Sequence, residues 1–136
     1  MWIVFKTIFK KLLNNISRKP LTNYDIIKYI KLLRIPNFRG IFMRDKLPKK
    51  IHKNENGVVN LDDDSGEGTH WTAYIKKGKN VIYFDSYGNL RPPTELITYF
   101  NSDKNENIIH YNYNNYQPFN KTNCGELYLK FLYNNR

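Results

Sequence analysis

The spacing of apolar residues changes twice along this 136-residue chain. It has a helical period up to about Pro36, alternates between apolar and polar residues from Trp71 to Lys76, and turns helical again from Cys124. A chain of this length supports one domain with a core of modest size, so these helices and strands are expected to share that core. We therefore predict one α+β domain over residues 21–136, preceded by a basic amphipathic segment at residues 1–20.

The stranded part of the chain is predicted to contain a tight hairpin. Residues Trp71–Lys76 alternate as expected for one strand, and Lys77–Asn80 has the composition of a hairpin turn. The apolar run Val81–Phe84 then predicts a short second strand, which carries Asp85 at its carboxyl end. A third strand is predicted at Ile108–Tyr113.

Three helices are predicted after the amino-terminal segment. The first begins at a capping Thr22 or Asn23 and is closed by Pro36. A short second helix follows Pro92-Pro93. The third begins at Cys124 and is predicted to be mostly buried, because apolar residues recur four positions apart along it.

The region between the first helix and the strands is polar. Residues 54–68 are rich in Asn, Asp and Gly and are predicted to form a solvated loop. The aspartates in this loop lack the spacing and the closing Glu of a calcium-binding EF-hand. The candidate zinc ligands also lack the paired spacing of a zinc site; they are His52, His70, His110 and Cys124. No metal ion or other cofactor is therefore expected to be required for the chemistry.

Basic residues are concentrated in the first part of the chain. Residues 1–53 contain fourteen Lys or Arg and two acids, whereas residues 54–136 contain eight Lys or Arg and ten acids. This asymmetry favours a polyanionic partner, nucleic acid being the commonest, although a solvated basic face would produce the same counts. DNA is therefore one possible partner of residues 1–53.

The single cysteine, Cys124, indicates the compartment. It excludes an intrachain disulfide and fits a reducing intracellular environment. Lysines interrupt the apolar start of the chain, so no signal peptide is predicted. No stretch approaches the roughly 20 apolar residues needed to span a membrane, and we expect a monomer without a transmembrane segment.

Four residues supply the chemical groups of a cysteine protease. Cys124 would be the nucleophile, because the start of a helix stabilises a thiolate. His70 would act as the base, and Asp85 would orient its imidazole ring. The side-chain amide of Gln117 and the backbone N–H of Cys124 would form an oxyanion hole. Each residue alone has an ordinary structural explanation, so it is the combination that indicates proteolysis.

Three motifs surround these residues: Gly-Thr-His-Trp at 68–71, Tyr-Phe-Asp-Ser-Tyr-Gly at 83–88, and Gln117 followed by Asn-Cys-Gly at 123–125. They resemble the motifs of the adenovirus endopeptidase (adenain) family and, more distantly, those of the SUMO-specific Ulp-type proteases. The resemblance extends to related proteases of Polinton/Maverick elements and large DNA viruses. It covers about Leu21 to Phe131.

This resemblance implies a papain-like cysteine protease fold, in which a small mixed sheet packs against the helix that carries the nucleophile. It implies that the four residues have the roles given above, and that Trp71 and Gly125 contact the substrate. The implied substrates are precursor proteins of a virus or mobile element, cleaved at sites that contain small residues or Gly. The implied location is the virion, or the cytoplasm or nucleus of the infected cell, and DNA or a peptide is an implied activator.

The chain departs from the adenovirus pattern in two ways. Asp85 stands where those enzymes usually carry Glu, although Asp is normal in the wider clan. The chain has only twelve residues after Cys124, so the carboxyl-terminal helices of larger relatives are not expected. Two alternatives stay open: a catalytically inactive nucleic-acid-binding accessory or virion protein, and a protease that removes a ubiquitin-like modifier.

Overall fold

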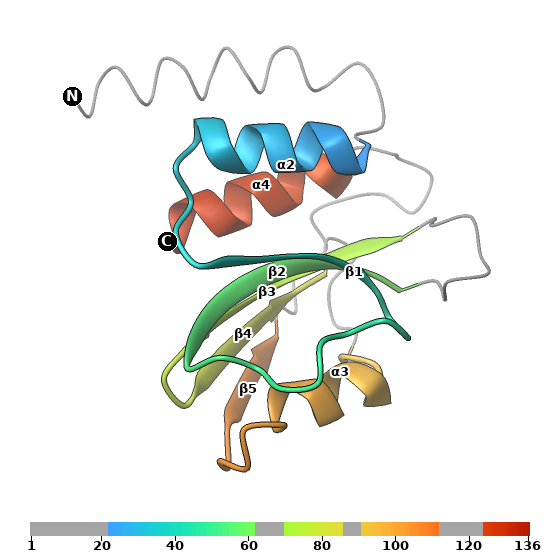
Figure 1. The fold of residues 1–136 in the computed structure, drawn as a ribbon, viewed down its shortest axis with the longest axis vertical. Coiled ribbons are helices and arrows are strands. Elements are labelled where there is room, and N and C mark those ends of the chain that lie inside the picture. Colours follow the sequence, from blue (N-terminus) through green and yellow to red (C-terminus); the bar gives the residue numbers. More distant parts are fainter. Residues whose placement is uncertain (1–21, 62–69, 86–90, 112–123) are drawn as a thin grey trace.

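A computed structural model describes residues 22–61, 70–85, 91–111 and 124–136. Of residues 124–126 it describes the helical backbone alone. These ranges form a five-stranded mixed sheet with helices on both faces (Figure 1). The predicted α+β class is therefore confirmed.

The strands of the sheet lie in the order of the sequence. β1 (Phe38–Met43) pairs in parallel with β2 (Asn54–Asn60), and β2 pairs antiparallel with β3 (Trp71–Lys77). β3 and β4 (Asn80–Phe84) form an antiparallel hairpin, and β4 pairs in parallel with β5 (Ile108–Tyr111). The three strands predicted from the sequence are β3, β4 and β5.

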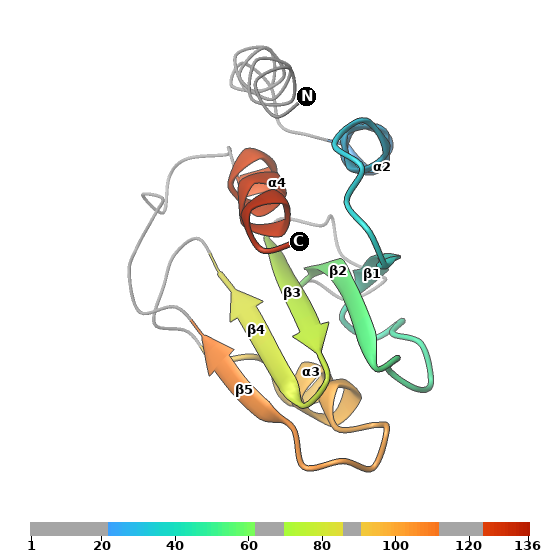
Figure 2. The ribbon, with the colours of Figure 1, turned by 90° about the vertical axis from the view of Figure 1, so that its left-hand side faces the viewer.

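Helices cover both faces of this sheet. α2 (Asn23–Leu32) and α4 (Cys124–Asn134) lie on one face, and α3 (Thr94–Phe100) lies on the other (Figures 1 and 2). Thr22 caps α2, because its hydroxyl accepts the N–H of Asp25 while the Asp25 carboxylate accepts the N–H of Thr22. All three helices begin where the sequence predicts.

Residues 54–60 form a buried strand, so the predicted polar loop is wrong over this range. The strand is buried at six of its seven positions. Its polar side chains find partners far away in the sequence: the Glu55 carboxylate accepts from Arg39, and the Asn56 amide donates to the carbonyl oxygen of Pro36. β1 was also missed, because its residues are mixed in polarity and only partly buried.

Burial of both faces gives the fold two apolar clusters. The first joins α2 and α4 to the sheet, and its buried members include Ile26, Ile30, Val58, Ala73, Ile75, Phe84, Tyr128, Leu129 and Leu132. The second joins α3 to the opposite face, and its buried members include Val59, Tyr74, Val81, Tyr83, Leu96, Tyr99 and Phe100. The sheet therefore separates two cores.

Several sequence predictions lie outside the described residues. They include the amphipathic segment 1–20, the aspartates 62–64, the last two residues of the third predicted strand (112–113) and Gln117. The boundary between residues 20 and 21 stays a prediction. Within the ranges given above, no helix is long and apolar enough to cross a membrane.

Candidate active site

His70 and Asp85 lie next to each other at one end of the sheet. Nε2 of His70 is 3.0 Å from each carboxylate oxygen of Asp85. The Asp85 side chain is only 1% exposed and the His70 side chain 18%. The pair is therefore largely shielded from water, and its electrostatic interaction is stronger than that of a surface pair.

The β3–β4 hairpin brings these two residues together. The strands are joined by a two-residue turn, in which Gly78 adopts a φ of 60° that favours glycine. The strand register that follows from this turn, extended by one pair, places Asp85 opposite Thr72. His70 then lies on the same face as a diagonal neighbour of Asp85, within reach of a long side chain.

This geometry decides which ring nitrogen can act as a base. A carboxylate only accepts hydrogen bonds, so Nε2 of His70 carries the hydrogen that faces Asp85. In the neutral ring the basic nitrogen is then Nδ1. The negative charge of Asp85 also stabilises the imidazolium that forms when Nδ1 takes a proton.

Cys124 is the first residue of α4, as predicted. The amino-terminal end of this 11-residue helix points toward the end of the sheet where β3 begins and β4 ends (Figure 1). A thiolate at this position would be stabilised by the partial positive charge of the helix terminus. The side chain of Cys124 and the whole of Gln117 lie outside the described part of the chain, and the predicted substrate contact of Gly125 stays a prediction.

Two further residues border the His70–Asp85 pair. Trp71 is the first residue of β3 and packs, half-buried, against the apolar cluster beneath α2 and α4. Its predicted contact with substrate stays a prediction. Thr72 was not singled out from the sequence; it is fully buried, and its hydroxyl donates to the carbonyl oxygen of Val59. The register of the predicted hairpin could have identified Thr72 from the sequence, because it places Thr72 opposite Asp85.

The site was also compared with metal centres and with known proteins. Within the described ranges, no group of three or more His, Cys, Asp or Glu side chains is arranged to hold a metal ion. Neither protein-family models nor curated proteins match this chain. The functional proposal therefore rests on the sequence motifs and on the geometry of the site.

Proposed function

We propose that this chain is a papain-like thiol endopeptidase with the adenain arrangement of catalytic groups. The observation that carries the proposal is the pairing of His70 with the buried carboxylate of Asp85. An imidazole oriented by a carboxylate is the base that a thiol nucleophile needs. The start of α4 at Cys124 supports the assignment of the nucleophile. The proposed substrates are precursor proteins cleaved at sites that contain small residues or Gly.

Acylation would begin with transfer of the Cys124 proton to Nδ1 of His70. The thiolate attacks the carbonyl carbon of the scissile bond, and negative charge develops on the carbonyl oxygen. The Gln117 amide and the backbone N–H of Cys124 are proposed to stabilise this charge. The imidazolium then protonates the leaving amine, the C–N bond breaks, and a thioester remains.

Hydrolysis of the thioester would restore the free enzyme. Nδ1 of His70 takes a proton from water, and the water oxygen attacks the thioester carbonyl. The C–S bond breaks, the peptide leaves as a carboxylic acid, and Cys124 returns to the thiolate. Asp85 holds the ring in one orientation through both steps and stabilises the imidazolium without taking the proton.

Alkylation of the lone cysteine tests the proposal before any substrate is known. The reaction of the native protein with iodoacetamide is followed from about pH 4 to 10, which spans activated and free thiols. Every modified thiol reports on Cys124, because the chain has one cysteine. We expect reactivity well below the free thiol pKa of about 8.5, and its loss in His70→Ala. A thiol that titrates near the free value in both proteins would refute the proposal.

Two further variants make this experiment specific. His110→Ala is the matched control, because His110 is exposed on β5, and it should leave the alkylation profile unchanged. Asp85→Asn removes the charge that stabilises the imidazolium. Once a Gly-containing peptide substrate is found, this change should lower kcat by about 100-fold or more. Equal activity of Asp85→Asn and the parent protein would contradict the role of the acid.

The basic excess in residues 1–53 favours a second candidate, a nucleic-acid-binding protein without catalytic activity. Cys124→Ala separates the two candidates, since it abolishes proteolysis but leaves nucleic-acid binding and its steep salt dependence intact. A ubiquitin-like protein with a reporter amide at its carboxyl terminus tests the variant in which the enzyme removes a modifier. Cleavage of this reporter in preference to Gly-containing peptides would favour that variant.

A further inference from the structure

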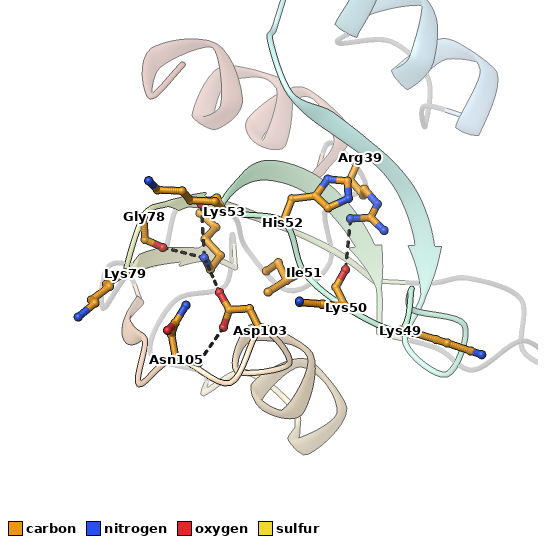
Figure 3. Close-up of a pocket in the computed structure, with 11 residues that line it drawn as sticks. Arg39, Lys49, Lys50, Ile51, His52, Lys53, Gly78, Lys79, Asp103 and Asn105 are labelled. Atoms are coloured by element: carbon orange, nitrogen blue, oxygen red, sulfur yellow. Dashed lines mark hydrogen bonds and ion pairs between the residues drawn. The ribbon is translucent and has the colours of Figure 1, made fainter.

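A pocket of about 740 Å³ lies at the other end of β3 from His70. Its walls come from four parts of the chain: Arg39 of β1, the segment 49–53, the end of β3 with the turn that follows it, and the loop after α3 (Figure 3). Ile51 lies at the centre of this wall, and its backbone is buried between β2 and the end of α3. The volume is in the range of pockets that bind small molecules.

Positive charge dominates this pocket. Two of its cations are neutralised, since Arg39 pairs with Glu55 at 2.9 Å and Lys76 pairs with Asp103 at 2.9 Å. Four exposed lysines around it have no acidic partner among the described residues; they are Lys49, Lys50, Lys53 and Lys79. Lys50 projects toward Ile51 and the middle of the pocket, whereas Lys49 points away from it (Figure 3). Lys53 and Lys79 extend outward from the rim of the pocket, so Lys50 is the one lysine of the four drawn toward its middle (Figure 3).

Buried contacts hold the backbone beneath these lysines. The Lys76 side chain is 1% exposed, and its Nζ donates to the carbonyl oxygens of Lys53 and Gly78 as well as to Asp103. The backbone N–H of Ile51 donates to the hydroxyl of Ser102. These contacts fix the positions from which the lysines extend, so little backbone order has to be gained when a ligand binds.

We propose that this pocket binds a compact polyphosphate, such as inorganic tripolyphosphate or the triphosphate of a nucleotide. Lys50, Lys53 and Lys79 are exposed, flexible side chains around one pocket, and a ligand with several adjacent negative charges offsets the repulsion between them when they turn toward it. Lysine ammonium groups bind phosphate oxygens as mobile point charges. A duplex presents a long row of phosphates, which matches an extended basic strip better than a single pocket.

This site is separate from the candidate active site. β3 has seven residues, so about 20 Å separates the end at His70 from the end at the turn. A ligand in the pocket therefore leaves the His70–Asp85 pair accessible. Binding can be measured on its own, and its result does not depend on whether the chain is a protease.

Isothermal titration calorimetry of the full chain with sodium tripolyphosphate tests the proposal. ATP without Mg²⁺ is titrated in parallel, and a difference between the two ligands shows whether a base and sugar contribute. Sulfate, which has one anionic group, is titrated as well, to show whether binding needs several adjacent negative charges. The pocket variant carries three substitutions at exposed positions: Lys50→Gln, Lys53→Gln and Lys79→Gln. We expect it to bind tripolyphosphate about tenfold or more weakly than the parent chain.

The control variant loses the same charge on the helices that cover the opposite face of the sheet. It carries Lys28→Gln, Lys31→Gln and Lys130→Gln, all at exposed positions. Its affinity for tripolyphosphate should stay within about threefold of the parent chain at moderate salt, because distant surface charges are screened. Unfolding temperatures of both variants show that each is folded during the titration.

Three results would overturn the proposal. The first is an absence of tripolyphosphate binding at millimolar concentration in the parent chain. The second is an equal loss of affinity in the pocket and control variants, which would show attraction by overall charge alone. The third is binding of a 20-nucleotide single strand at concentrations where tripolyphosphate and ATP do not bind, which would assign the surface to nucleic acid.

Discussion

Replacement of Glu55 by Gln should destabilise the protein strongly, although it changes a single atom of the side chain. The Glu55 side chain is 1% exposed. Its Oε1 accepts hydrogen bonds from the Arg39 guanidinium and from the backbone N–H of His52. Its Oε2 accepts from the hydroxyls of Tyr74 and Tyr99. One carboxylate thus accepts hydrogen bonds from β1, β3, α3 and the segment before β2.

The loss of unfolding free energy in Glu55→Gln can be estimated from the hydrogen-bond acceptors that are removed. In Gln an NH₂ group takes the place of one oxygen and cannot accept from the two donors that face it. Each buried donor without an acceptor costs about 1–3 kcal/mol, so the two donors together cost the variant about 2–6 kcal/mol. Burial and the Glu55 carboxylate raise the pKa values of Tyr74 and Tyr99, so both hydroxyls stay protonated at neutral pH. For this chain length the melting temperature should fall by roughly 10 °C.

Thermal and urea unfolding, followed by circular dichroism, measure this loss. Glu95→Gln is the matched control, because the Glu95 side chain is 48% exposed and lies 3.9 Å from Arg44, so it should cost less than about 0.5 kcal/mol. In a double-mutant cycle, Tyr99→Phe should cost less in the Glu55→Gln background than alone, because the two residues share a contact. A Glu55→Gln protein as stable as the Glu95→Gln control would refute the reasoning.

Two further predictions concern the same buried region. Gly57→Ala places a Cβ atom 2.8 Å from the Tyr74 ring and should lower the unfolding free energy by about 1–3 kcal/mol; an unchanged urea midpoint would contradict it. Burial alone would raise the pKa of Asp103, but hydrogen bonds from Lys76 and the backbone of Asn105 lower it from 3.8 to about 2. The stabilisation that Asp103 provides is fully present when the pH is above the pKa of this carboxyl in the unfolded chain. It is lost as the pH falls from about 4 to 2. Asp103→Asn should therefore flatten the decline of melting temperature over this range, and an equally steep decline would count against the ion pair.

The elements that the sequence predicts correctly are those whose causes are local. Thr22 and Asp25 cap α2 within one turn of the chain. The turn at Gly78 sets the hairpin register, and that register is enough to bring His70 to Asp85. For such features a short stretch of sequence contains all of the interacting groups.

The elements that the sequence misses depend on partners far away in the chain. Glu55 and Asn56 give β2 the composition of a loop, and they are tolerated in a buried strand because distant groups accept or donate their hydrogen bonds. Tyr99, one of these partners, is 44 residues away from Glu55. The lysine pocket is built from four separate segments, so no single stretch of sequence predicts it.

The hairpin that joins His70 to Asp85 also bears on the order of folding. Only fifteen residues separate the two side chains, and hairpins of this kind form in about 1–10 μs. α4 follows the hairpin after a much longer stretch of chain, so its docking closes a larger loop and comes later. In the proposed enzyme the base and its acid are therefore assembled early, and the nucleophile joins them last. In that proposed enzyme, a partly folded chain would thus have an inactive thiol.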